Sequence, residues 1–332
     1  MIQSIYIESA IAKHPRTQFI LKRFPKASRV ECDRYGEVFN PKAQNFRLQK
    51  QQPALILAQK FENHVLPAPD GYGVGGKRNF YFSHMLNCLY DCRYCFLQGM
   101  FNSAHYVLFV NYEDFANTID ATIATYPNEE IWFFSGYDCD SLAMEPVTGF
   151  VEHILPLFER NPNAFLELRT KSTQIRGLLD AHPLENVIVA FSFTPQNISD
   201  ALEHKVPKLD KRINAIRELQ QAGWPVGLRL DPLIYHDDYK RDYLDLYKNL
   251  FGALDADKLH SVSLGSFRLP KSYYKKIVKL YPDESLLHGP LTTLSAMVSY
   301  EQDLDEELRS FCMEGLKKHV PQDILFVCTT GA

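Results

Sequence analysis

The chain has 332 residues, long enough for one large α/β domain with appendages or for two domains. Its 45% hydrophobic and 23% charged residues are the composition of an ordinary globular protein that can bury a sizeable core. No apolar run reaches the roughly 18 residues that a membrane span requires, so we expect no membrane partner. The net charge of -4 gives no general reason to expect a nucleic-acid partner, although a local basic patch is compatible with one.

Cysteine usage points to a reducing compartment. Seven cysteines is an odd number, and four of them are scattered along the chain without a framework: Cys32, Cys139, Cys312 and Cys328. The first residues also lack a basic region followed by an apolar one, as a secretory signal would have. We therefore expect a cytoplasmic protein.

The first 77 residues place short apolar pieces in a basic background, so we expect an N-terminal extension over residues 1–77. Six cations gather there: Lys13, Arg16, Lys22, Arg23, Lys26 and Arg29. Such a run is typical of a solvated face, and a phosphate-contacting surface is the alternative. A glycine-rich run at 71–76 matches G-x-G-x-x-G, but it precedes a strand-like segment instead of opening a helix, so we interpret it as a loop.

A cysteine motif, C-x3-C-x2-C, follows the strand-like run at 79–87 and consists of Cys88, Cys92 and Cys95. Three thiolates on one short loop are close enough to hold one iron–sulfur cluster. Such clusters usually take four cysteines, and no fourth lies nearby in the sequence, so one iron would be open for chemistry. Tyr94 and Phe96 among the ligands would keep water from the cluster. The motif predicts a [4Fe-4S] cluster.

Zinc is the alternative metal for this loop. A structural zinc site takes four ligands, usually from two separated C-x-x-C pairs. The only nearby substitute for a second pair is His84. A non-catalytic iron–sulfur or zinc-binding module is thus a third class of function beside the two enzymes described below.

From residue 79 onward, β-branched or aromatic runs alternate with helical patterns, which predicts βα units around a parallel sheet. The strands are expected at 79–87, 130–134, 164–169, 186–193, 225–230 and 258–264. Helices are expected at 113–126, 148–160, up to 179, 209–222, 238–251 and 271–280. Six such units fit a partial barrel or a curved open sheet, which we place at residues 78–282.

Polar residues follow the carboxyl ends of these strands, where the working residues of parallel sheets gather. The cysteine loop follows the first strand, and residues 135–140 follow the second. Lys171, Ser192 and Asp231 stand at the ends of the third, fourth and fifth. We therefore expect one site at one rim. The remaining residues, 283–332, predict a small α+β appendage with a hairpin or short strand at 291–300, an acidic helix at 303–318 and a strand at 324–328.

The cysteine motif resembles that of the radical SAM enzymes. In these enzymes the open iron binds S-adenosylmethionine, and an electron from the cluster cleaves it to a 5′-deoxyadenosyl radical. More of the chain resembles the spore photoproduct lyases, in segments at 5–8, 95–98, 169–171, 191–192, 231–235 and 267–270. The resemblance implies an α/β fold, a partial (β/α)6 radical SAM barrel with the N-terminal extension and the C-terminal appendage. It also implies a DNA repair lyase that reverses a thymine photodimer.

Carried over to this chain, the resemblance makes the three cysteines the cluster ligands and places Tyr94 beside S-adenosylmethionine. Lys171 would pair with the carboxylate of that cofactor, as an ammonium point charge can, and Ser192 would hydrogen-bond to it. The implied partners are damaged DNA and an electron donor, which is a reductase or a flavodoxin- or ferredoxin-type protein.

The chain departs from the family at the hydrogen donor. The lyases carry a donor cysteine just after the second strand, and here Cys139 lies one or two positions late, so that Tyr137 takes the donor's place. The alternative for Cys139 is a packing role only, as a small buried side chain. Phe96 stands where the lyases have a tyrosine that relays hydrogen, and a phenyl ring cannot do so. We keep both Cys139 and Tyr137 as candidate donors.

The hairpin is the second departure. Photoproduct lyases insert a hairpin rich in arginine, tyrosine, glycine and lysine into damaged DNA, whereas residues 291–303 contain one aromatic residue and no cation. Two enzymatic hypotheses result: a lyase acting on a thymine lesion in DNA, and a radical SAM enzyme of the same fold acting on a different substrate.

Overall fold

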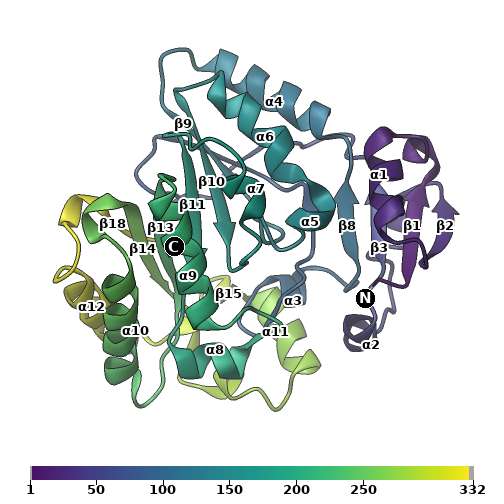
Figure 1. Ribbon diagram of the computed structural model, residues 1–332. Coiled ribbons are helices and arrows are strands. Elements are labelled where there is room, and N and C mark those ends of the chain that lie inside the picture. Colours follow the sequence, from purple (N-terminus) through teal and green to yellow (C-terminus); the bar gives the residue numbers. More distant parts are fainter. Residues whose placement is uncertain (1, 329–332) are drawn as a thin grey trace.

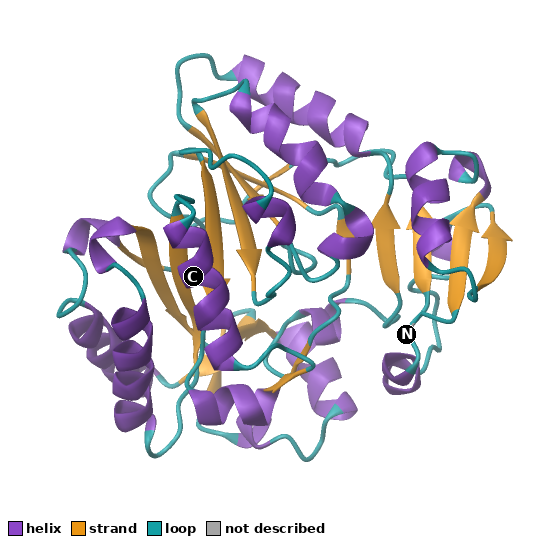
Figure 2. Cartoon of the chain, in the orientation of Figure 1, coloured by secondary structure: helices purple, strands orange, loops and turns teal. Residues whose placement is uncertain are grey.

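The computed structural model describes residues 2–328, and its centre is a curled sheet of eight strands (Figures 1 and 2). The strand order is β18-β14-β13-β11-β10-β9-β5-β4. Their bounds are β4 Leu66–Pro67, β5 Arg78–Phe82, β9 Ile131–Ser135, β10 Ala164–Thr170, β11 Val187–Ser192, β13 Val226–Leu233, β14 Leu259–Ser266 and β18 Leu325–Val327. The six strands from β5 to β14 are parallel neighbours, so the predicted partial barrel is confirmed. At its two edges, β18 adds a parallel strand and β4 an antiparallel one.

Helices follow the barrel strands, as the alternating pattern predicts. They are α4 Tyr112–Thr125, α5 Glu145–Thr148, α6 Phe150–Glu159, α7 Arg176–Leu179, α8 Gln196–Leu202, α9 Leu209–Gln221, α10 Tyr239–Ala253 and α11 Lys271–Leu280. The α6 helix buries Phe150, Ile154 and Phe158 at four-residue spacing. It begins two residues later than expected because Gly149 adopts a left-handed φ of 56°, which ends α5 and starts α6.

The N-terminal part of the chain forms most of a second sheet, at the purple end of Figure 1. Its order is β2-β1-β3-β8-β6, formed by β1 Ser4–Glu8, β2 Ser28–Cys32, β3 Leu55–Ala58, β6 Met85–Leu86 and β8 Tyr106–Phe109. Its helices are α1 Pro15–Arg23 and α2 Phe46–Gln51. Since β6 and β8 come from beyond residue 77, this sheet extends past the expected N-terminal extension; the domain boundaries themselves stay a prediction.

The single strand expected at 79–87 is wrong. The segment forms β5 in the barrel sheet and β6 in the N-terminal sheet. It ends at Asn87, whose left-handed φ of 66° turns the chain into the cysteine loop. The Asn87 side-chain amide donates to the carbonyl oxygens of Ser103 at 2.7 Å and His105 at 2.8 Å, which holds this turn. The sequence analysis predicted no strand at the position of β8.

The glycine-rich run lies between β4 and β5 and packs on the inner face of the barrel sheet. Val74 forms a small apolar cluster with Trp132, Phe134 and Ile188, separate from the main core. A Cβ atom at Gly76 would collide with the Trp132 ring, so only glycine allows this close approach.

The C-terminal residues form the expected hairpin, β16 Leu291–Leu294 and β17 Met297–Tyr300, which pairs with β15 Arg268–Pro270. The helix α12 Gln302–Leu316 packs beside α10 (Figure 1). Short 3-10 turns occur at Ser9–Ile11, Tyr35–Glu37, Ala256–Lys258, Ser285–His288 and Gln322–Ile324. Within residues 2–328, no helix combines the length and apolar character needed to cross a membrane.

Candidate active site at the carboxyl end of the barrel

One cavity of about 540 Å³ opens at the carboxyl ends of the barrel strands. The three cysteines line it together with Lys171, Ser192 and Asp231, so the rim expected from the strand ends exists. The hairpin contributes Met297 and α11 contributes Tyr273. A second hollow, of about 610 Å³, lies over α2 and is lined only by four glutamines and a leucine, which offer no acid, base or metal ligand.

The cysteine loop is held by backbone pairing. Its middle cysteine belongs to the short strand β7 Asp91–Cys92, which pairs with β12 Glu203–His204. The Cys95 N–H donates to the Cys92 carbonyl at 3.1 Å, and the Tyr90 N–H donates to the Cys88 Sγ at 3.4 Å. The helix α3 Leu97–Met100 begins directly afterwards. The loop therefore presents its thiols from a fixed backbone.

The three thiols fit a cluster better than a free nucleophile. Burial raises the pKa of Cys88 to about 12 and also raises the pKa of Cys92 and Cys95. Such thiols become thiolates when a metal centre supplies the compensating positive charge. Among residues 2–328, no three His, Cys, Asp or Glu side chains converge around a single metal ion. Cys88, Cys92 and Cys95 would instead suit a cluster, which supplies several irons.

A buried polar network joins Tyr94 and Ser192, the residues expected beside S-adenosylmethionine. The Tyr94 hydroxyl donates to the Glu203 carboxylate, which also accepts from Arg212 at 2.7 Å. Arg212 donates in turn to the Ser192 carbonyl at 3.0 Å. Both Glu203 and Arg212 have side chains with 0% exposure. Sequence reasoning missed them because nothing in their local pattern marks them, and Glu203 lies 109 residues from Tyr94.

Lys171 is held in its charged form beside this network. Burial lowers the pKa of Lys171, but the neighbouring Cys92 and Glu203 outweigh burial and raise it above its usual value. Its Nζ lies 5.6 Å from the centre of the Tyr94 ring. The site thus presents an ammonium group next to the cysteine loop.

Asp140 fixes the loop after β9 to the end of β10. Its Oδ1 accepts from the Leu142 N–H at 3.0 Å and from the Thr170 hydroxyl at 2.7 Å. Its Oδ2 accepts from the Lys171 N–H at 2.6 Å. This partly buried carboxylate ties the loop that carries both candidate donors to β10, a contact that the sequence analysis did not assign.

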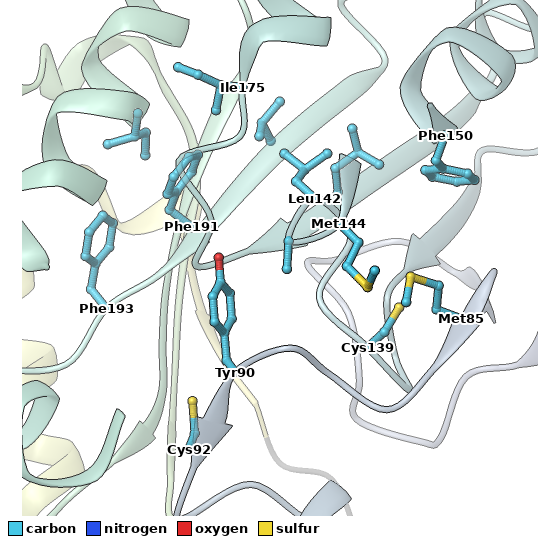
Figure 3. Close-up of a cluster of buried hydrophobic side chains, with 14 of the residues drawn as sticks. Met85, Tyr90, Cys92, Cys139, Leu142, Met144, Phe150, Ile175, Phe191 and Phe193 are labelled. Atoms are coloured by element: carbon cyan, nitrogen blue, oxygen red, sulfur yellow. The ribbon is translucent and has the colours of Figure 1, made fainter. Parts of the chain in front are cut away.

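The two candidate donors lie differently in the cavity, although both line it. The Tyr137 ring lies 5.6 Å from Phe96 and 4.4 Å from Tyr81, between centroids. Cys139 points toward Met85 and lies near Met144, within an apolar cluster (Figure 3). Tyr137 therefore stands over the residue after the third cysteine, whereas Cys139 faces the core.

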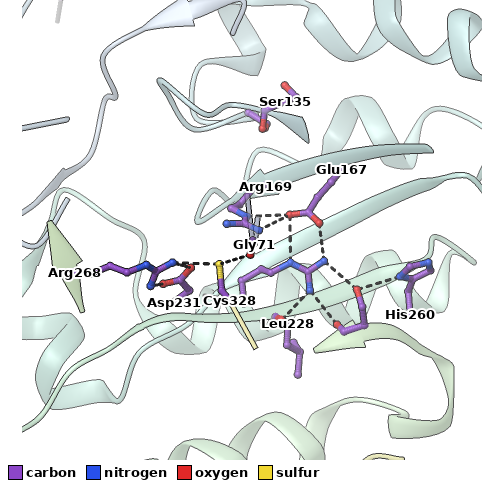
Figure 4. A network of polar contacts seen from close by, with 12 residues as sticks. Gly71, Ser135, Glu167, Arg169, Leu228, Asp231, His260, Arg268 and Cys328 are labelled. Carbon is purple, nitrogen blue, oxygen red and sulfur yellow. Dashed lines mark hydrogen bonds and ion pairs between the residues drawn. The ribbon is translucent and has the colours of Figure 1, made fainter. Parts of the chain in front are cut away.

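Below the cavity, the barrel interior holds paired charges (Figure 4). Glu167 binds Arg229 at 2.7 Å and Arg169 at 2.9 Å. Gly227 leaves room for the Arg229 guanidinium, whose atoms would lie 3.0 Å from a Cβ at that position. Nearer the cavity, Arg268 binds Asp231 at 3.1 Å and contacts Cys328. These groups form a charged floor to the site.

Comparison with known proteins identifies related chains. The family model described as spore photoproduct lyase matches residues 80–289. The spore photoproduct lyase of Bacillus subtilis (strain 168) is 27% identical over 202 residues, which cover 60% of this chain and 59% of that protein. The one from Geobacillus sp. (strain Y412MC61) is 24% identical over 241 residues, covering 71% and 66%. The chain thus spans about six tenths of the curated relatives that it matches.

Solved structures show the same fold. A spore photoproduct lyase double mutant with bound AdoMet and dinucleoside spore photoproduct superposes with a TM-score of 0.85 at 17% identity, over 100% of this chain and 99% of that one. Another spore photoproduct lyase, complexed with the dinucleoside, gives 0.83 at 17% identity, over 99% and 98%.

Proposed function

Since the chain belongs to the spore photoproduct lyase family, we propose that it is a radical SAM lyase that reverses a thymine photodimer in DNA. The observation that carries this proposal is the single cavity shared by the cysteine loop, Lys171 and the loop with Tyr137 and Cys139. Groups that would hold the cofactors and groups that would meet the substrate therefore face one space.

Cys88, Cys92 and Cys95 would hold the [4Fe-4S] cluster, and Tyr94, Lys171 and Ser192 would hold S-adenosylmethionine. Together these cofactors would supply the 5′-deoxyadenosyl radical. The Lys171 ammonium would pair with the carboxylate of S-adenosylmethionine. Glu203 holds the Tyr94 ring in place by accepting a hydrogen bond from the Tyr94 hydroxyl. All seven cysteines are free, which supports a reducing, cytoplasmic compartment.

The cavity also has suitable walls for a pyrimidine lesion. Its volume lies within the range of small-molecule sites. Aromatic rings of Tyr72, Phe267 and Tyr273 line it and can stack on bases. Arg268 at the floor offers a cation, since it lines the cavity while it binds Asp231.

Tyr137 is the hydrogen donor that the geometry favours. Its position over Phe96 and Tyr81 places a phenol in the cavity, whereas Cys139 turns toward Met85. In the donor step, the hydrogen atom leaves the Tyr137 oxygen and forms a C–H bond on the thymine radical, and a tyrosyl radical is left behind. Tyr81 and Tyr72, at centroid distances of 4.4 and 5.7 Å, can share that radical.

A different substrate is the second candidate function. The observations that favour it are the hairpin, which carries no cation between residues 291 and 300, and Phe96 in place of a relay tyrosine. The electron donor would in either case be a reductase or a flavodoxin- or ferredoxin-type protein.

The test is anaerobic. The cluster is reconstituted and reduced, and the protein is incubated with S-adenosylmethionine with and without a dinucleotide carrying the thymine photoproduct. Restored thymine together with 5′-deoxyadenosine supports the lyase. Formation of 5′-deoxyadenosine while the lesion persists supports the second substrate. Iron and sulfide content without cleavage of S-adenosylmethionine would leave only the non-catalytic module.

A further inference from the structure

The helix α11 differs from the other helices of the barrel in its exposed charge. It carries Lys271, Lys275, Lys276 and Lys279, all exposed, and Ile277 is its only buried residue. Within residues 271–280 there is no acidic side chain to pair with them. On α12, by contrast, Arg309 forms an ion pair with Asp305 of the same helix.

This arrangement of like charges destabilises α11. Lys271, Lys275 and Lys279 stand four residues apart, so they share one face of the helix. Like charges at this spacing repel and destabilise a helix. A stripe of this kind is consistent with an anionic partner, because such a partner relieves the repulsion.

The stripe begins beside the mouth of the cavity, since Pro270, the residue before Lys271, lines it. Tyr273 also lines the cavity, from the side of α11 opposite to Lys271 and Lys275. The helix packs directly on α3, which follows the cysteines (Figure 1). At its start, the Lys271 N–H donates at 2.8 Å to the carbonyl of Ala296 in the turn of the hairpin. Next to that turn, Leu294 is 55% exposed.

We propose that the α11 lysines bind the backbone phosphates of the DNA strand whose lesion occupies the cavity. The inference rests on the proposed function and deepens it, since it names the surface that supplies the cations missing from the hairpin. Eight residues of helix span about 12 Å from Lys271 to Lys279, the length of about three or four phosphates of one strand. The hairpin then provides an apolar tip, and α11 provides the charge.

The other basic region of the chain lies far from the site. Lys13, Lys22 and Lys26 are exposed on or beside α1, which covers the N-terminal sheet. None of them lines the cavity. They serve as a matched control with the same number of exposed lysines.

The test measures binding of a fluorescent oligonucleotide that carries one thymine photoproduct, at several salt concentrations. We compare the wild-type holoenzyme with the triple variant Lys271→Gln, Lys275→Gln, Lys279→Gln and with the control variant Lys13→Gln, Lys22→Gln, Lys26→Gln. Each phosphate contact contributes about 0.7–0.9 to the slope of log K against log salt. The α11 variant should lose about 2 to 3 from that slope, and the control should keep the wild-type slope.

Repair of the dinucleotide by wild-type protein tests the proposed function separately. If the dinucleotide is repaired but the α11 variant keeps the wild-type slope, the inference is wrong and the function stands. An equal loss in both variants would also overturn it, because the charge effect would then be general. If the dinucleotide persists, the function fails whatever the slopes are. Circular dichroism checks that each variant is folded.

Discussion

The Tyr94 hydroxyl donates a hydrogen bond to the buried carboxylate of Glu203, which joins the cysteine loop to β12. Glu203 is in turn neutralised by Arg212 and accepts from the Ser199 hydroxyl at 2.8 Å. The side chain next to the third cysteine is thereby tied to the ion pair that supports Ser192. The proposed cofactor residues Tyr94 and Ser192 and the buried ion pair are thus linked through one carboxylate.

We therefore expect Tyr94→Phe to weaken S-adenosylmethionine binding about tenfold while the protein stays folded. Glu203 keeps Arg212 and Ser199, so the stability lost should be about 1 kcal/mol, as for one hydrogen bond. Equilibrium dialysis gives the affinity and thermal unfolding gives the stability. An affinity equal to that of the wild type would show that the ring is not held for the cofactor.

Cys92→Ala should abolish the cluster, because Cys92 is one of the three ligands that we propose on the loop. The measurement is iron and acid-labile sulfide per chain after anaerobic reconstitution. Cys32→Ala is the control, since Cys32 lies at the end of β2 in the N-terminal sheet and does not line the cavity. Equal iron contents in the two variants would remove Cys92 from the ligand set.

Tyr137→Phe should reduce thymine restoration at least about tenfold and leave the cluster content unchanged, because a phenyl ring lacks the hydroxyl hydrogen that tyrosine can donate. Cys139→Ala should retain repair, since Cys139 faces Met85. With wild-type protein in D2O, the restored thymine should carry deuterium, because the phenolic hydrogen exchanges. If instead Cys139→Ala stops repair and Tyr137→Phe does not, the thiol is the donor.

Gly99→Ala should separate α3 from α11. A Cβ at Gly99 would lie 2.6 Å from the Tyr273 carbonyl oxygen, which is backbone and cannot move aside cheaply. We expect a lower melting temperature and poorer retention of iron. Gly252→Ala is the matched control in α10, where a Cβ meets nothing within 4 Å and should stabilise the helix by up to about 1 kcal/mol. Similar behaviour of the two variants would exclude the clash.

Glu167→Gln should destabilise the barrel by about 3–5 kcal/mol, because it leaves Arg229 buried without its counter-charge. Urea unfolding followed by circular dichroism measures the loss. Glu129→Gln is the control, since its pair with Arg78 is on the surface and contributes at most about 1 kcal/mol. A loss as small as the control's would mean that water or another group compensates Arg229.

The Glu167 carboxylate also makes the stability of the folded protein depend on pH in the acidic range. Burial by itself raises the pKa of Glu167, but Arg229 and Arg169 outweigh it and lower the pKa from 4.5 to about 2. The unfolded chain then binds more protons than the native one between these values, so stability falls as the pH falls from about 4.5 toward 2. Glu167→Gln should remove this part of the pH dependence, which a urea series at several pH values would show.

Local patterns determined the barrel. Each of its six strands is a short apolar run bounded by turn residues, and α11 has the bounds that its pattern predicts, Lys271–Leu280. The cysteine spacing likewise needed no tertiary information, since three thiols within eight residues share one loop in any fold. The convergence of strand ends at one rim follows from parallel pairing alone.

Only the tertiary structure decided which distant groups meet. Glu167 and Arg229 are 62 residues apart, and hydrophobic periodicity reports burial at each position without naming the partner of a buried charge. The split of residues 79–87 between two sheets depends on β8, which pairs with β6 from outside the segment. Asp140 anchors the loop of Tyr137 and Cys139 to β10 through residues 30 and 31 positions away. Sequence placed both donors in one loop that lines the cavity, and packing turned Tyr137 toward Phe96 and Tyr81 and Cys139 toward Met85.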